Sequence, residues 1–264
     1  MSFLTLDKVS HYYFTKNGYT KALDHVSLSI EEGEFISLLG PSGCGKSTVL
    51  SIIAGIIQQS EGNVFLKDRK ISDSKLAIGY MLQQDYLFPW RTIIDNVLLG
   101  PQMNKVNTER MKKKGLALLA EVGLSKVAAD YPDSLSGGMR QRAALVRTLI
   151  TDPEILLLDE PFSALDFLTK LKLEDLVSEL LKTYQKTAVL VTHDIGEAIS
   201  MSDRIFLMDA NPGTIAKVFE VPVELRHETP FLVRRHPKYQ IIFDKVWAAL
   251  NQSEATVTNK GGEH

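Results

Sequence analysis

The chain has 264 residues, of which 44% are hydrophobic and 23% are charged, and its 30 Lys and Arg residues nearly balance 32 Asp and Glu residues. This composition is ordinary for a globular protein and argues against a disordered, collagenous or repetitive chain. A net charge of −2 argues against a broadly basic nucleic-acid-binding protein, and the single cysteine, Cys44, excludes both an internal disulfide and a cysteine-based zinc site. No apolar run approaches the roughly 20 residues of a membrane span, and the N-terminus lacks the features of a signal peptide.

The first third of the chain predicts strands that lead into a glycine-rich loop. Turn signals at Asn17-Gly18 and Glu32-Gly33 separate the first strands. A helix is expected from Lys46 to Ile57, directly after the loop. The strands expected in this part are 2–10, 23–39, 63–66 and 77–82.

The middle of the chain, residues 93–150, has helical spacing of its apolar residues and predicts a helical insertion. Strands and helices then alternate, which is typical of a parallel sheet in an α/β protein. Past about residue 220 the pattern weakens to an amphipathic helix near 239–250 and a polar tail, Thr256–His264, which is expected to be disordered. The alternating elements are strands at 155–159, 187–192 and 204–208 and helices at 167–183 and 194–201.

The glycine-rich loop fits the pattern G-x-x-x-x-G-K-[ST]. Glycines let backbone N–H groups close around phosphate oxygens, and the following helix directs its positive N-terminus at them. Lys46 is expected to reach the β- and γ-phosphates of a nucleotide, and the Ser47 hydroxyl to bind Mg²⁺. A chance glycine-rich turn before a lysine is the alternative, which the strand before and the helix after make remote. The residues expected to bind nucleotide here are Gly40, Ser42, Gly43, Cys44, Gly45, Lys46, Ser47 and Thr48, with Cys44 as an inert member.

Two carboxylates follow the apolar strand Ile155–Leu158. Ligands of open α/β sheets bind at the carboxyl ends of the strands, where Asp159 and Glu160 would lie. Asp159 would hold the Mg²⁺ shell, and Glu160 would act as the general base that activates water. Taken alone, an Asp-Glu pair at the end of a strand is more often exposed to solvent than catalytic. The phosphate-binding pattern that includes Lys46 makes the catalytic interpretation the more favoured one here.

Residues 135–142, Leu-Ser-Gly-Gly-Met-Arg-Gln-Arg, resemble the signature motif of ATP-binding-cassette (ABC) ATPases. Ser136 precedes Asp159 by 23 residues, as in that family, and Asp159–Asp166 resembles the family's Walker B motif and D-loop. The resemblance covers roughly residues 2–220, and Met139 departs from the Gln of many members. It implies a P-loop NTPase (RecA-like) core with an antiparallel β subdomain and an inserted α-helical subdomain at about 85–150. An ABC ATPase domain would then span residues 1–220, followed by a C-terminal helical extension and flexible tail at 221–264.

The signature motif offers a second anion site, because Ser136-Gly137-Gly138 opens a helix. One cassette binds one nucleotide, so the economical arrangement is a head-to-tail dimer with two-fold symmetry. The family is known for this arrangement. Ser136, Gly137, Gly138 and Asp166 are therefore expected to act in trans, on the ATP of a second copy of the chain.

Further roles are implied by the resemblance. Gln83, rather than its neighbour Gln84, matches the glutamine that binds Mg²⁺ and senses the γ-phosphate, and His193 matches the histidine that steadies the γ-phosphate and the attacking water. Tyr13 matches the aromatic residue that stacks on adenine, although Tyr12 and Phe14 compete for that role and each could equally be packed in the core. The presence of both Glu160 and His193 favours hydrolysis over mere nucleotide binding.

The segment Gln83–Thr92 and the turn Asn211–Ile215 resemble those of nitrate, sulfonate and taurine importers. The resemblance implies two membrane permease subunits, an extracytoplasmic binding protein and a peripheral location on the cytoplasmic face of the cell membrane. The solute would be a small anion of that kind or a thiamine-pyrimidine precursor. An exporter or lipid-moving ATPase is the alternative; a DNA-repair or translation protein is disfavoured because only 53 residues separate Gln83 from Ser136. Trp90 would line a docking groove for the permease or belong to the core.

For two further segments, one basic and one near the C-terminus, we expect a structural role. Lys105, Arg110 and Lys112–Lys114 are expected to form a solvated helix face, with anionic lipid binding as the alternative. The stretch through Arg234 and Trp247 is expected to be a helix packed on its own domain, with a regulatory ligand site as the alternative.

Overall fold

The structure is a computed structural model that describes residues 2–16, 18–67, 69–71, 78–106 and 108–260. It divides into two compact units. Unit 1 comprises Met1–Lys75 and Leu181–His264, and unit 2 comprises Leu76–Leu180. The predicted turn residue Asn17 and the last four residues of the predicted tail lie outside the described residues.

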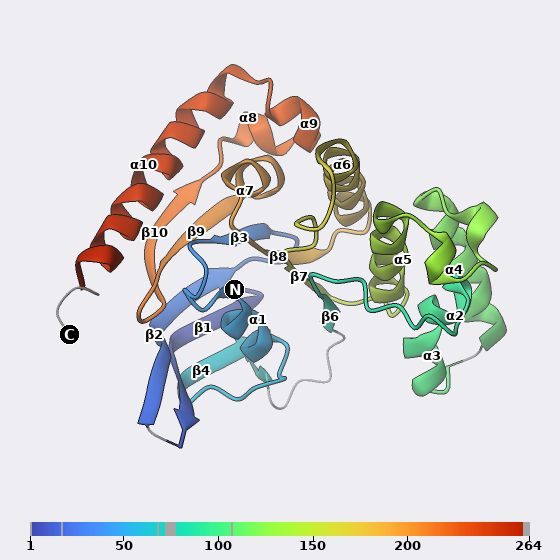
Figure 1. The fold of residues 1–264 in the computed structure, drawn as a ribbon, viewed down its shortest axis with the longest axis horizontal. Helices are drawn as coiled ribbons and strands as arrows, with labels where there is room; N and C mark the ends of the chain where they lie inside the picture. The colour runs from blue at the N-terminus through green and yellow to red at the C-terminus, as the bar shows by residue number, and fades with distance from the viewer. Residues whose placement is uncertain (1, 17, 68, 72–77, 107, 261–264) are drawn as a thin grey trace. The chain divides into compact units, whose positions relative to one another are not determined.

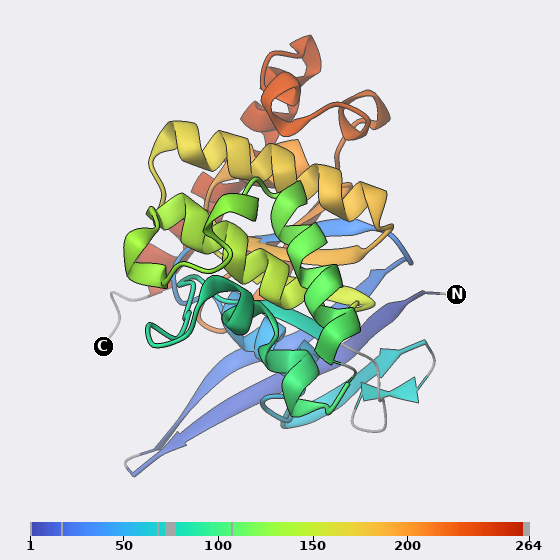
Figure 2. The same ribbon diagram turned by 90° about the vertical axis from the view of Figure 1, so that its right-hand side faces the viewer.

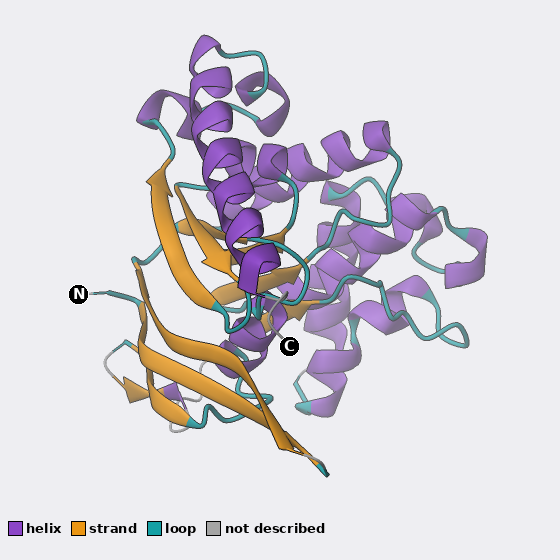
Figure 3. Ribbon diagram, turned by 60° about the vertical axis from the view of Figure 1, so that its left-hand side comes forward, coloured by secondary structure: helices purple, strands orange, loops and turns teal. Residues whose placement is uncertain are grey.

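Unit 1 contains an antiparallel sheet with the strand order β2-β1-β4-β5 (Figure 3, orange). β1 continues five residues beyond its predicted end, because its aromatic stretch pairs with β2 as far as Thr15 opposite Gly18. The register shifts between Leu6 and Tyr12 mark an irregular stretch in this long pair. The strands are β1 (Leu4–Thr15), β2 (Gly18–Ile30), β4 (Glu61–Leu66) and β5 (Arg69–Lys70).

A second sheet of unit 1 has its strands in the order β10-β9-β3-β8. β3 is parallel to both β8 and β9, and all five of its residues are buried, as expected for a strand covered on both faces. β10 was not predicted; it is an antiparallel strand beside β9, and most of its side chains are exposed or half-buried. These strands are β3 (Phe35–Leu39), β8 (Thr187–Thr192), β9 (Arg204–Asp209) and β10 (Thr214–Glu220).

The helices of unit 1 differ most from the prediction at the C-terminal ends of α1 and α10, and the short helices α8 and α9 were not predicted. α1 stops at Ile53, four residues early, because Gly55 adopts a left-handed conformation (φ +69°) that breaks the helix. α10 is longer than predicted and includes residues 256–260 of the tail that was expected to be disordered. It packs against α7, β9 and β10 (Figure 1, red). The helices are α1 (Lys46–Ile53), α7 (Ile195–Met201), α8 (Val223–Arg226), α9 (Pro230–Val233) and α10 (Pro237–Lys260).

Unit 2 pairs two parallel strands, β6 (Ile78–Met81) and β7 (Ile155–Asp159), and carries the predicted helical insertion between them. α4 and α5 lie side by side in it (Figure 2, green). The predicted bounds of β7 and α6 match the structure, and the α/β fold class is confirmed. Within the described residues, no helix is both long and apolar enough to cross a membrane. The helices are α2 (Ile93–Val97), α3 (Leu99–Met103), α4 (Thr108–Glu121), α5 (Gly137–Leu149) and the start of α6 (Phe167–Thr183).

Candidate active site

The glycine-rich loop of unit 1 connects β3 to α1 and depends on close backbone contacts. Gly43 and Gly45 adopt left-handed conformations, with φ values of +81° and +91°. A methyl group on Gly45 would lie 2.5 Å from Leu23 Cδ2, and one on Gly40 would lie 2.6 Å from the carbonyl oxygen of Met208. Both positions therefore require glycine, and the tight loop before a helix N-terminus is of the kind that can bind a phosphate group.

The turn between β9 and β10 packs against the glycine-rich loop. A methyl group on Gly213 would lie only 2.2 Å from the carbonyl oxygen of Cys44. The Gly213 N–H donates to the Ala22 carbonyl at 3.0 Å, and the Asp24 N–H donates to the Gly213 carbonyl at 2.9 Å. In the sequence, this Pro-Gly turn stood out only through a family resemblance. Its contact with the glycine-rich loop could not be predicted from the sequence pattern.

The ammonium group of Lys46 lies against the loop. Its Nζ donates to the carbonyl oxygens of Gly40 at 2.7 Å and Pro41 at 2.8 Å, and the side chain is only 6% exposed. Cys44 is completely buried beside it, with Sγ 3.6 Å from Nζ. Burial raises the pKa of the Cys44 thiol, which keeps it neutral and unreactive near neutral pH.

Tyr13 is the aromatic residue of β1 that reaches the helix after the loop. Its hydroxyl lies 3.3 Å from Thr48 Oγ1, and its ring meets His11 edge-on with centroids 4.6 Å apart. Tyr12 instead contacts Tyr19, at a centroid distance of 5.7 Å. Tyr13 is 44% exposed and Phe14, which contacts Tyr19, is 78% exposed, so the prediction that one of the three aromatic residues stacks on adenine stays open.

His193 follows β8, and the glycine-rich loop follows β3. Leu39 and Thr192 are register partners in these parallel strands, so both segments leave the sheet at the same edge. His193 is exposed, and the loop that carries it is fixed by hydrogen bonds. Thr192 Oγ1 accepts from the Asp194 N–H at 2.9 Å and donates to Glu197 Oε2 at 2.5 Å, and Asp194 Oδ1 accepts from the Gly196 N–H at 2.7 Å.

The corresponding edge of unit 2 brings Gln83 to the acidic pair. Met81 and Leu158 are register partners in the parallel strands β6 and β7, so Gln83 and Asp159 both follow that edge. Gln83 Nε2 donates to Ser163 Oγ at 3.1 Å, and this hydroxyl donates to the Glu160 carbonyl at 3.0 Å. Tyr80 donates its hydroxyl to Asp159 Oδ2 at 3.3 Å. Glu160 itself has a left-handed backbone, with φ +46°.

Side chains from one face of α5 hold the segment that starts at Gln83. Gln141 Nε2 donates to the Gln83 carbonyl at 2.8 Å, and Arg140 Nε is paired with Asp85 Oδ2 at 3.0 Å. The Arg147 guanidinium donates to the carbonyl oxygens of Asp85 at 2.6 Å and Tyr86 at 2.7 Å. Sequence reasoning missed this contribution; the spacing of Arg140 and Arg147 by two helical turns was the available signal.

The signature motif begins α5 and lies against the start of α6. Ser136 caps α5, with Oγ accepting from the Met139 N–H at 3.4 Å. A methyl group on Gly138 would lie 2.3 Å from Thr169 Cγ2. Asp166 Oδ1 accepts from the Thr169 N–H at 3.1 Å, and hydrogen bonds from Thr169 lower the pKa of Asp166. Thr169 therefore links the two segments predicted to act in trans.

The predicted magnesium ligands supply a hydroxyl, an amide oxygen and a carboxylate, which are the hard oxygen donors that Mg²⁺ prefers. Ser47 belongs to unit 1, and Gln83 and Asp159 belong to unit 2. Among the described residues there is no group of three or more His, Cys, Asp and Glu side chains that could hold a metal by themselves. Each of these donors is of a kind that suits Mg²⁺, which usually keeps several waters and binds phosphate oxygens together with one or two protein groups.

Known proteins share this combination of motifs and fold. The model of the ABC transporter family matches residues 23–163, just over half of the chain. The chain is 56% identical over 259 residues to YtlC of Bacillus subtilis (strain 168), an ABC transporter ATP-binding protein, with 98% of this chain and 100% of the relative covered. It is 39% identical to the aliphatic sulfonates import ATP-binding protein SsuB of Bacillus licheniformis, with 95% and 94% covered.

Solved structures agree with these sequence relatives. The ATP-binding cassette MJ0796, determined as a dimer in a post-hydrolysis state bound to ADP and Pi, superposes with a TM-score of 0.73 at 34% identity, covering 83% of this chain and 99% of that one. The likeness in sequence therefore extends to the arrangement of the strands and helices that carry the motifs. The chain belongs to the ABC transporter family, as an ATP-binding subunit that hydrolyses ATP.

Proposed function

We propose that this chain powers an ABC importer for a small solute, and that the surface beside Gln83 receives the membrane subunits. Phe88 is 39% exposed and Trp90 is 70% exposed, with ring centroids 5.0 Å apart. The alternative that Trp90 belongs to the core is wrong, because most of its side chain faces solvent. An exposed aromatic pair of this kind is typical of an interaction surface.

The observation that carries the proposal is the set of hydrogen bonds that holds this aromatic surface. Asn96 is fully buried, and its Oδ1 accepts from the Phe88 N–H at 2.7 Å. Its Nδ2 lies within 3.1 Å of the carbonyl oxygens of Phe88, Arg91 and Thr92. A loop held this firmly can transmit a displacement of α5 and Gln83 to a helix docked on the aromatic rings.

The relatives support the importer class, and the candidate solutes come from their printed function together with the sequence resemblance. SsuB proteins are named for the import of aliphatic sulfonates, so a sulfonate, nitrate or taurine-like anion is the first candidate solute and a thiamine-pyrimidine precursor the second. Two permease subunits and an extracytoplasmic binding protein would complete the complex. The chain would then be a peripheral subunit on the cytoplasmic face of the membrane.

For hydrolysis, we assign each predicted residue one task. The loop N–H groups and Lys46 bind the phosphates, and Tyr13 stacks on the adenine. Glu160 accepts the proton of the attacking water, and His193 donates a hydrogen bond that steadies the γ-phosphate. Ser47, Gln83 and Asp159 would hold Mg²⁺, which neutralises phosphate charge when bound.

We further propose that two copies close head-to-tail on two ATP molecules. Ser136, Gly137 and Gly138 would present a helix N-terminus to the partner's γ-phosphate, and Asp166 would lie at the same interface. The dimeric MJ0796 structures support the pairing of two copies.

Cells that lack this chain provide the test of the importer. Wild-type protein should restore uptake of a labelled sulfonate, taurine or nitrate, while Glu160→Gln protein should not. The double variant Phe88→Ser, Trp90→Ser should fail to restore uptake although the purified protein still hydrolyses ATP. Increased retention of solute in the deleted cells, in place of reduced uptake, would favour the exporter alternative.

A further inference from the structure

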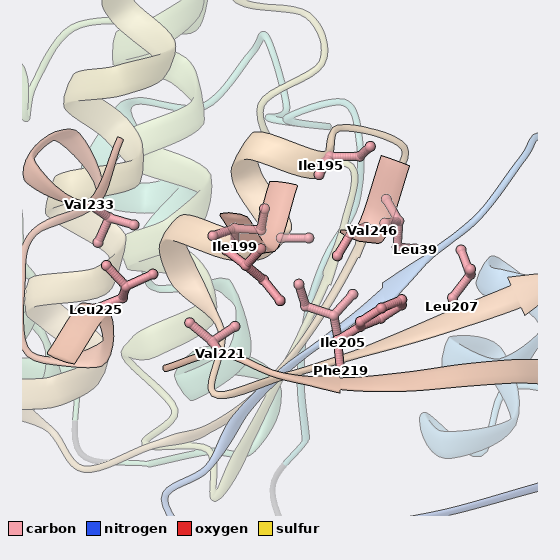
Figure 4. Close-up of a cluster of buried hydrophobic side chains, with 12 residues drawn as sticks. Leu39, Ile195, Ile199, Ile205, Leu207, Phe219, Val221, Leu225, Val233 and Val246 are labelled. Atoms are coloured by element: carbon pink, nitrogen blue, oxygen red, sulfur yellow. The ribbon is translucent and has the colours of Figure 1, made fainter. Parts of the chain in front are cut away.

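The C-terminal extension packs on the helix that follows His193. Ile195 and Ile199 of α7 belong to one buried apolar cluster with Val233 of α9 and Val246 of α10 (Figure 4). Each of these four side chains is at most 5% exposed. The extension is therefore built into unit 1 next to the His193 loop, and its apolar contacts fix the axis of α7.

Polar groups of the extension also reach the first turn of α7. A methyl group on Gly196 would lie 3.1 Å from the Tyr239 hydroxyl oxygen and 3.6 Å from Arg234 Nε. It would lie 3.0 Å from Asp194 Oδ1, the oxygen that caps the helix. Since glycine has no side chain, a phenol and a guanidinium can approach the capped helix end closely.

The polar groups of Tyr239 and Arg234 are chemically suited to hold the start of α7 in place. Asp194 directly follows His193, and both Tyr239 and Arg234 carry donors that complement a carboxylate. Arg234 is itself anchored, because its Nη1 donates to the Pro230 carbonyl of α9 at 3.2 Å. Neither donor comes from the segment that the ABC transporter model matches, residues 23–163.

We infer that Tyr239 and Arg234 are positioning residues that hold the His193 loop in the geometry needed for hydrolysis. The inference rests on the proposed role of His193 in that reaction. A loop misplaced by a fraction of an ångström loses rate without losing nucleotide affinity, because the phosphate loop and Tyr13 bind ATP independently of it. The extension thereby contributes to catalysis through the helix that it covers.

The test uses the full chain and conservative variants. Tyr239→Phe removes only a hydroxyl, and Arg234→Met replaces the guanidinium side chain by an uncharged, unbranched one without hydrogen-bond donors. Each should lower kcat for ATP hydrolysis by about three- to tenfold, with the KM for ATP and the melting temperature unchanged. Arg234→Lys should recover part of the rate. The matched controls are Arg235→Met, on the exposed neighbour, and Tyr131→Phe, on an exposed tyrosine of unit 2, and both should keep the wild-type rate.

A double-mutant comparison separates this inference from the proposed function. In a His193→Ala background, Tyr239→Phe should cause no further loss of kcat, because its effect passes through His193. A full additional loss there, or wild-type kcat in both single variants, would overturn the inference alone. A wild-type rate for His193→Ala itself would overturn the role of His193 and the inference together.

Discussion

At Gly138 the backbone of α5 approaches α6 so closely that a side chain has no room. A methyl group there would lie 2.3 Å from Thr169 Cγ2, whereas one on the neighbouring Gly137 would lie 3.8 Å from Leu165 Cδ2, an ordinary van der Waals contact. Gly138→Ala should therefore lower the free energy of unfolding by about 1–3 kcal/mol, as overpacking does. Gly137→Ala is the matched control and should cost much less. Urea unfolding followed by circular dichroism measures both.

Removal of the clashing methyl group provides the internal check on this explanation. Thr169→Ser deletes Cγ2 and keeps the hydroxyl, so it should recover most of the stability that Gly138→Ala loses. If the double variant is as unstable as Gly138→Ala alone, a cause other than the contact with Thr169 is responsible.

His11, whose ring contacts the ring of Tyr13, makes the free energy of unfolding depend on pH, and the direction of this dependence follows from its pKa. Burial lowers its pKa below the ordinary value of 6.5, although a backbone hydrogen bond at Gln58 acts in the opposite direction. Between the lowered pKa and 6.5 the unfolded chain binds more protons than the folded one. His11 therefore destabilises the fold as the pH drops below about 6.5.

His11→Gln removes this titration while leaving a polar side chain. The difference in unfolding free energy between wild type and variant should change as the pH falls from 7 towards 5, with the wild type losing more stability. A constant difference across that range would show that His11 titrates equally in the folded and unfolded states.

At the scale of single elements, the sequence predicts best where one signal dominates. The bounds of β7, α6 and β8 follow from a buried apolar run or a long amphipathic pattern. β10 was missed because its side chains are mostly exposed, so no apolar alternation marks it. The end of α1 was wrong because the pattern continues through Ile56, which the structure leaves 65% exposed.

The candidate site shows the same limit. Lys46, Asp159 and Ser136 could be found because their motifs need fixed local spacing. The role of Asn96 could not, because its hydrogen bonds depend on how the irregular loop before α2 folds back on that helix. The role of Tyr239 could not, because Tyr239 lies far along the chain from Gly196, which it approaches. Contacts of this kind are set by tertiary packing, which a single sequence does not display.

The prediction at the scale of single elements concerns Asn96. Asn96→Ala removes the hydrogen bonds to Phe88, Arg91 and Thr92 and leaves buried backbone groups without them, so it should destabilise unit 2 by about 2–4 kcal/mol. Asn104→Ala, at an exposed position of the same unit, should have little effect. In a Trp247→Phe background the fluorescence of Trp90 reports the loop directly. An unchanged Trp90 spectrum and unchanged stability would contradict the role given to Asn96.

At the scale of the whole molecule, the phosphate loop belongs to unit 1 and the signature motif to unit 2. The proposed head-to-tail dimer makes each nucleotide site from the phosphate loop of one copy and the signature motif of the other. Sites formed within one copy would instead need both motifs in the same chain. The two arrangements differ in what a mixture of damaged subunits can do.

Two variants in a Glu160→Gln background test this difference. Lys46→Ala damages the phosphate loop, and Ser136→Arg damages the signature motif, so each variant alone should stay monomeric with MgATP in light scattering. In a mixed dimer, the Lys46 of one copy meets the intact Ser136 of the other, which leaves one complete site of two. The mixture should therefore form dimers with MgATP that neither variant forms alone. Sites built within a single copy could never be completed by mixing, so a mixture that stays monomeric, while the Glu160→Gln parent dimerises, would refute the head-to-tail arrangement.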